Sequence, residues 1–186
     1  MISHIRNASI AAGLSLAGAM TTAQAEPLIR DAALFESFPI EGVSLSTLPE
    51  DAFNELIANG YGAGNVETYE QWGEGSLNLV RGAYGSPDGY SSVTIGRADG
   101  RLAFITQSLN KAGIDASAEI DAAQTHFGVD PDAPDCRMNA AGTSGACELR
   151  DAEAPDAVTM KFTMTAMATM ILRSISRPKD LAKTLE

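Results

Sequence analysis

The two cysteines are the residues whose chemistry the sequence restricts most. Cys136 and Cys147 lie eleven positions apart, so they do not form the CxxC motif of a thioredoxin-type redox site. The only histidine outside the first 25 residues is His126, so the pair also lacks the usual partners of a zinc site. Each cysteine adjoins residues that alternate as strands do, and a Gly-, Ser- and Thr-rich turn separates them. We predict a structural disulfide between paired strands, with Cα atoms within about 7 Å of each other.

Three glutamates could supply acid–base chemistry. Glu67, Glu70 and Glu74 lie close in sequence to Tyr69 and Trp72, whose rings could stack on a sugar. Glycoside hydrolysis needs two carboxylates that flank the scissile bond, and no spacing here singles out one pair. An ordinary polar strand face is therefore favoured, and a carbohydrate- or peptide-acting hydrolase is an alternative.

Four methionines could bind copper. The thioethers of Met160, Met164, Met167 and Met170 are soft ligands that suit Cu(I), which makes a periplasmic copper-binding protein a further alternative. Met160 and Met164, however, alternate with polar residues, and methionines on the apolar face of a strand usually fill the core.

Three other local patterns lack parts of the sites they resemble. The glycines at 60, 62 and 64 follow a predicted helix, whereas a phosphate loop follows a strand. Ser144 does not lie in a G-x-S-x-G elbow. Asp130, Asp132 and Asp135 could offer oxygens to calcium, but the intervening prolines break the EF-hand geometry. We therefore predict no catalytic, metal-binding or cofactor-binding residues, and no cofactor.

The first 25 residues have the organisation of a cleavable signal peptide. Arg6 gives a positive start, residues 8–20 are uncharged and mostly apolar, and Ala23-Gln24-Ala25 has the small-x-small pattern that signal peptidase accepts. We predict cleavage near Ala25 and a periplasmic or secreted mature protein. No later run approaches the ~20 apolar residues of a membrane span, so we expect no membrane-spanning segment.

Residues 26–186 have the length and composition of one small domain, with two sub-units that could meet near residues 110–130. The leader carries one basic residue, so the mature chain is one unit more negative than the net charge of −11 of the whole sequence. A surface of this charge repels phosphate backbones, and nucleic acid is therefore not an expected partner.

Two helices are indicated by apolar residues at helical spacing. The first begins at the capping box Thr47-Leu-Pro-Glu50, has Pro49 in its first turn, and ends at Gly60. The second runs from about residue 115 to 127, with Asp115 or Ser117 as its N-cap and Gly128 at its end.

The remaining segments alternate as strands do. Asp99-Gly100 predicts a tight turn between two of them. Residue 157 begins a half-buried strand with Met160 and Met164 on one face and Thr163 and Thr165 on the other. The other strands are predicted at 41–46, 65–72, 76–81, 90–97, 101–107, 136–139 and 146–150. Residues 167–176 fit either a strand or a helix, and the tail fits a short helix. The order favours an α+β fold in which helices pack on an antiparallel β-sheet, with one disulfide.

Three stretches carry a family resemblance: Gly42-Val-Ser-Leu-Ser, the helix that begins at Pro49 and ends at Asn59-Gly60-Tyr61, and the run from Val93 to Ile105. Together they resemble the small exported domains of the PepSY and BamE/SmpA families. The resemblance implies a helix on an antiparallel sheet and a role in binding. BamE-type proteins are lipoproteins, whereas this leader lacks the lipid-accepting cysteine.

These observations favour a non-enzymatic exported module that binds a protein, a peptide or another envelope component. The absence of a catalytic constellation and the family resemblance both point that way. Such a module would bind through its sheet or through an exposed sheet edge.

Overall fold

The computed structural model describes residues 31–151 and 158–184. Its centre is a seven-stranded sheet with the order β1-β2-β3-β7-β6-β5-β4, in which all neighbouring strands are antiparallel. Helices and this sheet confirm the predicted α+β class. The predicted signal peptide, residues 1–25, lies outside the described residues and stays a prediction.

The sheet consists of two meanders that meet at its centre. The first meander is β1 (Gly75–Gly82), β2 (Tyr90–Ala98) and β3 (Arg101–Asn110), and the second is β4 (Cys136–Met138), β5 (Ser144–Arg150), β6 (Lys161–Met167) and β7 (Met170–Ser176). Because β7 pairs with β3, residues far apart in the chain become neighbours in one continuous sheet.

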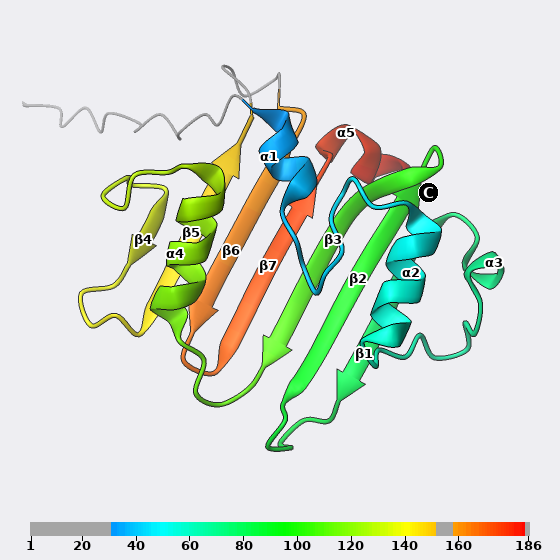
Figure 1. Cartoon of the computed structure of the whole chain (residues 1–186), viewed down its shortest axis with the longest axis horizontal. Coiled ribbons are helices and arrows are strands. Elements are labelled where there is room, and N and C mark those ends of the chain that lie inside the picture. Colours follow the sequence, from blue (N-terminus) through cyan, green and yellow to red (C-terminus); the bar gives the residue numbers. More distant parts are fainter. Residues whose placement is uncertain (1–30, 152–157, 185–186) are drawn as a thin grey trace, which may run out of the picture.

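The longer helices lie over one face of this sheet, as Figure 1 shows for α1 (Ala32–Ser37), α2 (Pro49–Ala58) and α4 (Ala116–Phe127). Leu56 of α2 and Phe127 of α4 belong to the same buried cluster as Ile105 of β3 and Phe162 of β6. The Phe127 and Phe162 rings are 4.9 Å apart between centroids. The remaining helical segments are α3 (Tyr69–Trp72), α5 (Pro178–Leu181) and the 3-10 turn η2 (Ala182–Thr184).

Several local predictions are confirmed by backbone geometry. Asp99 and Gly100 both have positive φ, at 53° and 74°, as a two-residue hairpin turn requires. The Asp115 carboxylate accepts a hydrogen bond from the Ala118 amide at the start of α4, and Gly128 ends that helix in the left-handed conformation. Residues 170–176, which fitted either a strand or a helix, form strand β7.

Three local predictions are wrong. The segment 65–72 is not a strand, because its last four residues form helix α3. The predicted capping box does not form, since α2 starts after Leu48 and the Thr47 hydroxyl instead accepts the Ser44 amide. Residues 41–46 hold only a bridge between Ile40 and Val43 rather than a strand.

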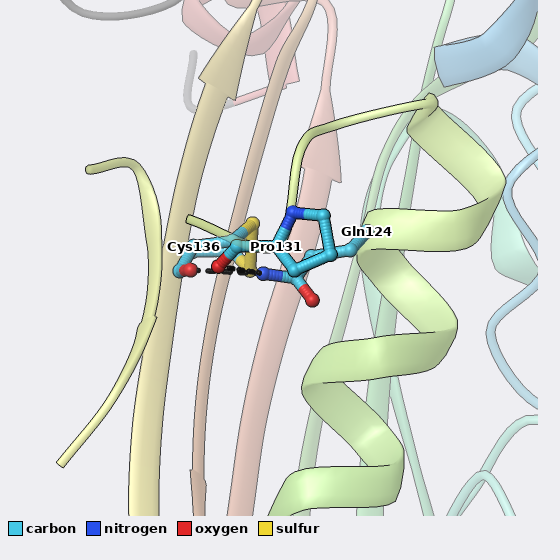
Figure 2. The surroundings of a disulfide bond; sticks show 4 residues. Gln124, Pro131 and Cys136 are labelled. Carbon is cyan, nitrogen blue, oxygen red and sulfur yellow. Dashed lines mark hydrogen bonds between the residues drawn. A yellow bond between two sulfur atoms is a disulfide. The ribbon is translucent and has the colours of Figure 1, made fainter. Parts of the chain in front are cut away.

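The predicted disulfide is confirmed. Cys136 of β4 and Cys147 of β5 are directly paired, with Cα atoms 4.0 Å apart, and both are buried. The Gln124 side chain on α4 donates hydrogen bonds to the carbonyl oxygens of Cys136 and Pro131 (Figure 2). The disulfide therefore fixes the short edge strand β4 to β5, and the Gln124 amide fixes it to α4.

Across residues 31–151 and 158–184, none of the helices has the length and apolar character needed to cross a bilayer.

Candidate functional site

Among the described residues, one face of the sheet carries no helix except at the end where α5 lies, and we call it the open face. In Figure 1 the helices lie in front of the sheet, so the open face is turned away from the viewer. Side chains alternate between the two faces along each strand. On β2, Val93 and Ile95 are buried under the helices, while Ser92 and Thr94 are half-buried on the open face.

The open face carries a row of hydroxyl side chains that crosses four adjacent strands. Thr94 is paired with Thr106, Thr106 with Ser174, and Ser174 with Thr163. We call these four residues the hydroxyl row. Adjacent strands are about 4.8 Å apart, which spaces the hydroxyl groups regularly along the row. At its two ends the row continues to Asn78 and Glu148.

A second row lies two residues along each of the same strands. It consists of Ser92, Ser108, Leu172 and Thr165, which are also paired in register. Three of these four side chains carry a hydroxyl group, and Leu172 is the single apolar member. The two rows together form a polar patch on the centre of the sheet.

The patch is concave. Both rows line a hollow of about 420 Å³, and alternation turns the side chains of Gln107, Met164 and Arg173 away from it to the helix-covered face. A second hollow of about 430 Å³ shares Thr163 and Thr165 with the first and extends toward β4 and β5. Ligand sites in proteins are typically concave regions of this volume.

Most of these hydroxyl groups form no hydrogen bond with the described residues. Ser92 and Thr94 both donate to the Asn78 side chain. Within the part of the chain that the structure describes, no hydrogen bond involves the other five hydroxyls of the two rows, which belong to Thr106, Ser108, Thr163, Thr165 and Ser174. Each of these groups can donate one hydrogen bond and accept two.

Aromatic residues mark both ends of the open face. At one end, Phe104 packs against Leu181 of α5, so the C-terminal segment covers that end. At the other end, Tyr90 occupies the same face by alternation, two residues before Ser92. The Tyr84 ring stacks on Tyr90 with centroids 4.2 Å apart, and Tyr84 is 73% exposed.

The sheet edges offer little room for an added strand. The outer edge of β1 is partly occupied, because Gly62 and Val80 exchange two backbone hydrogen bonds of 2.8 Å. The opposite edge strand, β4, is three residues long. Short or covered edges are how proteins avoid strand addition.

A polar network under the helices fixes the strands that carry the hydroxyl row. The Gln107 amide donates to Glu41 and Ser91 and accepts a hydrogen bond from Arg173. The Tyr61 hydroxyl joins the network at Ser91, and burial raises the pKa of Tyr61 above its ordinary value. Ser91 and Gln107 are buried, so their pairing avoids the cost of unsatisfied polar groups.

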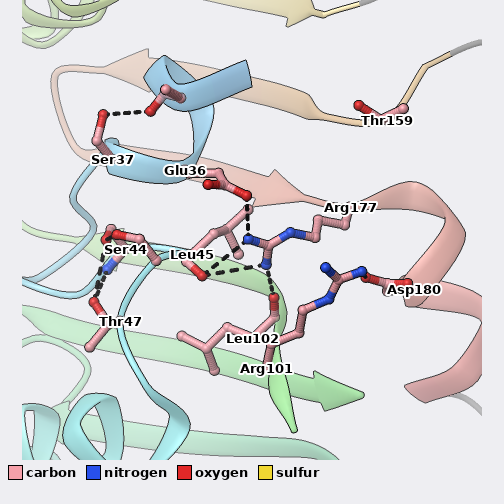
Figure 3. Close-up of polar contacts among 12 residues, drawn as sticks. Glu36, Ser37, Ser44, Leu45, Thr47, Arg101, Leu102, Thr159, Arg177 and Asp180 are labelled. Atoms are coloured by element: carbon pink, nitrogen blue, oxygen red, sulfur yellow. Dashed lines mark hydrogen bonds and ion pairs between the residues drawn. The ribbon is translucent and has the colours of Figure 1, made fainter. Parts of the chain in front are cut away.

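A buried arginine joins the C-terminal end of the sheet to the segment that precedes α2. The Arg177 guanidinium donates to the carbonyl oxygens of Leu45 and Leu102 and pairs with Glu36 of α1 at 2.8 Å (Figure 3). Arg101 nearby pairs with Asp180. Both arginines line a hollow of about 300 Å³ beside α1 and α5, and each already has a carboxylate partner.

The glutamates considered for acid–base chemistry do not share a hollow among the described residues. Glu74 lines a hollow with Asp99 and Lys183, and neither Glu67 nor Glu70 contributes to it. Trp72 is buried, and the Arg97 guanidinium lies 5.4 Å from its ring centroid and 5.0 Å from that of Tyr69. Trp72 therefore offers no surface to a sugar, and Arg97 covers one face of the half-buried Tyr69 ring.

The four methionines are divided between the two faces. Met160 and Met164 are buried in the core under the helices. Met167 and Met170 pair with each other at the β6–β7 turn, and alternation places them on the open face. The four thioethers therefore do not converge on one point.

The other residues considered for chemistry lie in turns or ladders. Ser144 is the first residue of β5, and Asp130 and Asp132 belong to the turn after α4, where the Asp130 carboxylate accepts the Asp132 amide. His126 contacts the Leu34 carbonyl oxygen at 2.7 Å. Among the described residues, no group of three or more His, Cys, Asp or Glu side chains is arranged to hold a metal ion.

The sequence predicted β2, β3 and β6 of the patch as strands but indicated a polar face only for β6, and it left the β7 segment as either a strand or a helix. The alternation in residues 157–165 placed Thr163 and Thr165 on a polar face. The aromatic pair was missed, although Tyr84 lies in a Gly-, Ser- and Pro-rich loop that signals exposure.

No family model, no curated protein and no solved structure matches the chain. The resemblance of residues 42–107 to the PepSY and BamE/SmpA families therefore stays a prediction.

Proposed function

We propose that this protein is an exported, non-enzymatic binding module that takes an extended, uncharged ligand on its open face. The observation that carries the proposal is the set of five hydroxyl groups that face shared hollows and have no described partner inside the protein. Polar groups in such positions satisfy their hydrogen bonds with water or with a ligand. A ligand with matching groups can replace that water without loss of hydrogen bonds.

The position of the patch favours binding through the sheet face over binding through a sheet edge. An added peptide strand would need a free and sufficiently long edge. Gly62 occupies part of one edge, and β4 forms only a short edge on the other side. The open face, by contrast, offers side chains from β2, β3, β7 and β6 at once.

The network beneath the patch supports a preformed site. Gln107 and Arg173 lie on the same strands as Thr106 and Ser174 but point to the helix-covered face, where they are hydrogen-bonded to each other. A rigid scaffold loses less conformational entropy on binding than a mobile loop does. Export follows from the predicted signal peptide and is part of the proposal.

The proposal can be tested by blocking the face. The full chain is expressed with a C-terminal tag and an intact N-terminus, and the exported protein is used to retain material from its native envelope fraction. We expect Thr106→Arg and Thr163→Arg to lower retention at least tenfold, because a long charged side chain would fill the hollow. Thr125→Arg is the matched control, since Thr125 is exposed on α4 over the opposite face.

The proposal would be contradicted if Thr106→Arg and Thr163→Arg retained as much envelope material as Thr125→Arg and the original protein. It would also be contradicted if the original protein retained none. Circular dichroism and thermal unfolding must show that the three variants remain folded. Mass analysis of the exported protein checks the signal peptide, and we expect a mature chain that begins at or near Glu26.

A further inference from the structure

From the composition of the open face, we infer that its ligand is a neutral carbohydrate chain, and that the exposed ring of Tyr84 supplies a stacking platform at one end of the site. This inference rests on the proposed function and identifies the chemical class of the ligand. It is carried by three features of the open face: its hydroxyl groups, its aromatic pair and the lack of charged side chains in its two central rows.

The hydroxyl groups match the hydrogen-bonding character of a sugar. Serine and threonine hydroxyls both donate and accept, as sugar hydroxyls do. Thr106, Ser174 and Thr163 lie side by side on three strands, so they present such groups at regular intervals to one extended ligand. A chain of similar sugar units could repeat its contacts along this row.

The aromatic pair adds an apolar surface where the polar patch ends. Tyr90 holds one side of the Tyr84 ring by stacking at 4.2 Å, with 19° between the ring planes. Because Tyr84 is 73% exposed, its ring remains open to solvent beyond that contact. A tyrosine offers a flat apolar ring together with a polar hydroxyl, and this combination suits the C–H face and the hydroxyl groups of a pyranose.

Charge favours a neutral carbohydrate over an anionic one. The side chains of the two rows, on β2, β3, β7 and β6, carry no charge. At the nearby end of the patch, Glu148 is paired with Lys161 at 2.5 Å. The sequence as a whole carries a net charge of −11, which would repel phosphorylated or uronic polymers. The side chains of the two rows include no cation, and the second hollow is lined by one arginine, Arg137, together with two acidic residues, Asp135 and Glu148.

The patch is a poor match for a protein partner. Protein interfaces gain most of their affinity from apolar and aromatic side chains buried in central pockets. The centre of the open face is hydroxylated, and its exposed large hydrophobic residues, Val80 and Leu172, stand singly on β1 and β7. A hydrated, polyhydroxylated ligand fits this centre better than an apolar anchor does.

The ligand class can be determined with the retention assay described above. Before capture, one portion of the envelope fraction is oxidised with periodate, which cleaves vicinal diols of sugars, and another is digested with protease. We expect periodate to abolish the retention that depends on Thr106 and protease to leave it unchanged. If protease abolishes it and periodate does not, the ligand is a protein, so the carbohydrate inference fails while the proposed function stands.

The role of Tyr84 is tested with defined probes, which are soluble neutral glucan, mannan, xylan and N-acetylglucosamine oligosaccharides and, as the anionic comparison, oligogalacturonate. We expect at least one neutral probe to bind. Tyr84→Ala should weaken its affinity roughly two- to tenfold and Tyr84→Phe should retain it, because stacking needs only the ring. The inference would be overturned if only oligogalacturonate bound, or if no probe bound. It would also be overturned if Tyr84→Ala and Tyr84→Phe bound a neutral probe with equal affinity.

Discussion

Arg173 of β7 donates a hydrogen bond of 2.6 Å to the side-chain oxygen of Gln107 on β3, the residue directly opposite it where the two meanders meet. The Gln107 nitrogen donates in turn to Glu41 and Ser91. One amide therefore connects both halves of the sheet to the turn that precedes α2. Gln107, which lies behind the hydroxyl row, therefore uses both of its N–H donors and its oxygen in hydrogen bonds.

Replacement of Gln107 by leucine should destabilise the fold by about 2–3 kcal/mol, because Arg173 and Ser91 would lose a partner in a buried setting. Urea unfolding of the original protein and of Gln107→Leu measures this change. Ser108→Ala is the control on the neighbouring residue, which faces the other way, and we expect an effect within about 0.5 kcal/mol. Equal effects of the two substitutions would contradict a special role for Gln107.

Loss of the disulfide should lower stability while leaving the open face intact. Cross-linking a loop of this size stabilises a fold by roughly 3 kcal/mol in the chain-entropy model, so we expect about that loss for Cys136→Ser/Cys147→Ser. The retention that depends on Thr106 should not change, because both cysteines are buried and neither lines the hollow formed by the two rows. Two thiols that react with an alkylating reagent in the folded exported protein would show that the bond is absent.

Three local signals each identified the structure that forms. The Asp99-Gly100 turn, the Asp115 cap and the pairing of Cys136 with Cys147 each depend on a few residues close in sequence. A two-residue turn and a short hairpin restrict the backbone so strongly that composition is sufficient to identify them.

The open face could not be predicted from the sequence, because it is formed by contacts between strands that lie far apart in the chain. Thr106 and Ser174 become neighbours only because β7 pairs with β3, and the alternation of each strand alone is compatible with many sheet orders. The segment 65–72 was misassigned for a different, local reason. Its residues alternate, but the Gln71 side chain accepts the backbone amides of Glu67 and Thr68, which favours a helical turn.

Arg177→Lys should be strongly destabilising although the charge is kept. The guanidinium reaches Leu45, Leu102 and Glu36, which belong to three separate segments, and a single ammonium group cannot satisfy all of them. We expect a loss of about 2–3 kcal/mol by chemical unfolding. Arg101→Lys is the matched control. The Arg101 side chain is 56% exposed, so its ion pair with Asp180 should contribute less than about 1 kcal/mol to stability.

The ion pair between Asp99 and Lys183 should be visible in titration. The hydrogen bond and charge of Lys183 lower the pKa of the Asp99 carboxyl below its ordinary value of 3.8, and Asp99 raises the pKa of Lys183 above 10.5. The carboxylate contribution is present above pH 3.8 and is lost as the pH falls through the lowered pKa. The lysine contribution is present below pH 10.5 and is lost as the pH rises through the raised pKa.

We therefore expect Lys183→Met to return the pKa of Asp99 toward 3.8, as measured by NMR titration of its carboxyl carbon. The pKa of Glu70 is also lowered, but by its own backbone amide and by Thr68, so it should not respond to this substitution. A shift of both carboxyl groups would indicate a general change of structure rather than loss of the pair.

Gly96 and Phe104 should be energetically coupled. They are directly paired on β2 and β3, and a Cβ atom at position 96 would lie 2.0 Å from the Phe104 ring. The ring cannot move freely, because it packs against Leu181 at the covered end of the open face. We expect Gly96→Ala to cost about 1–3 kcal/mol through overpacking and to displace the C-terminal segment, which limited proteolysis would detect. In the double variant Gly96→Ala/Phe104→Leu the smaller side chain should relieve the clash. The loss of stability of the double variant should therefore be smaller than the sum of the losses of the two single variants. Simple additivity of the two single losses would show that the glycine is not required by the ring.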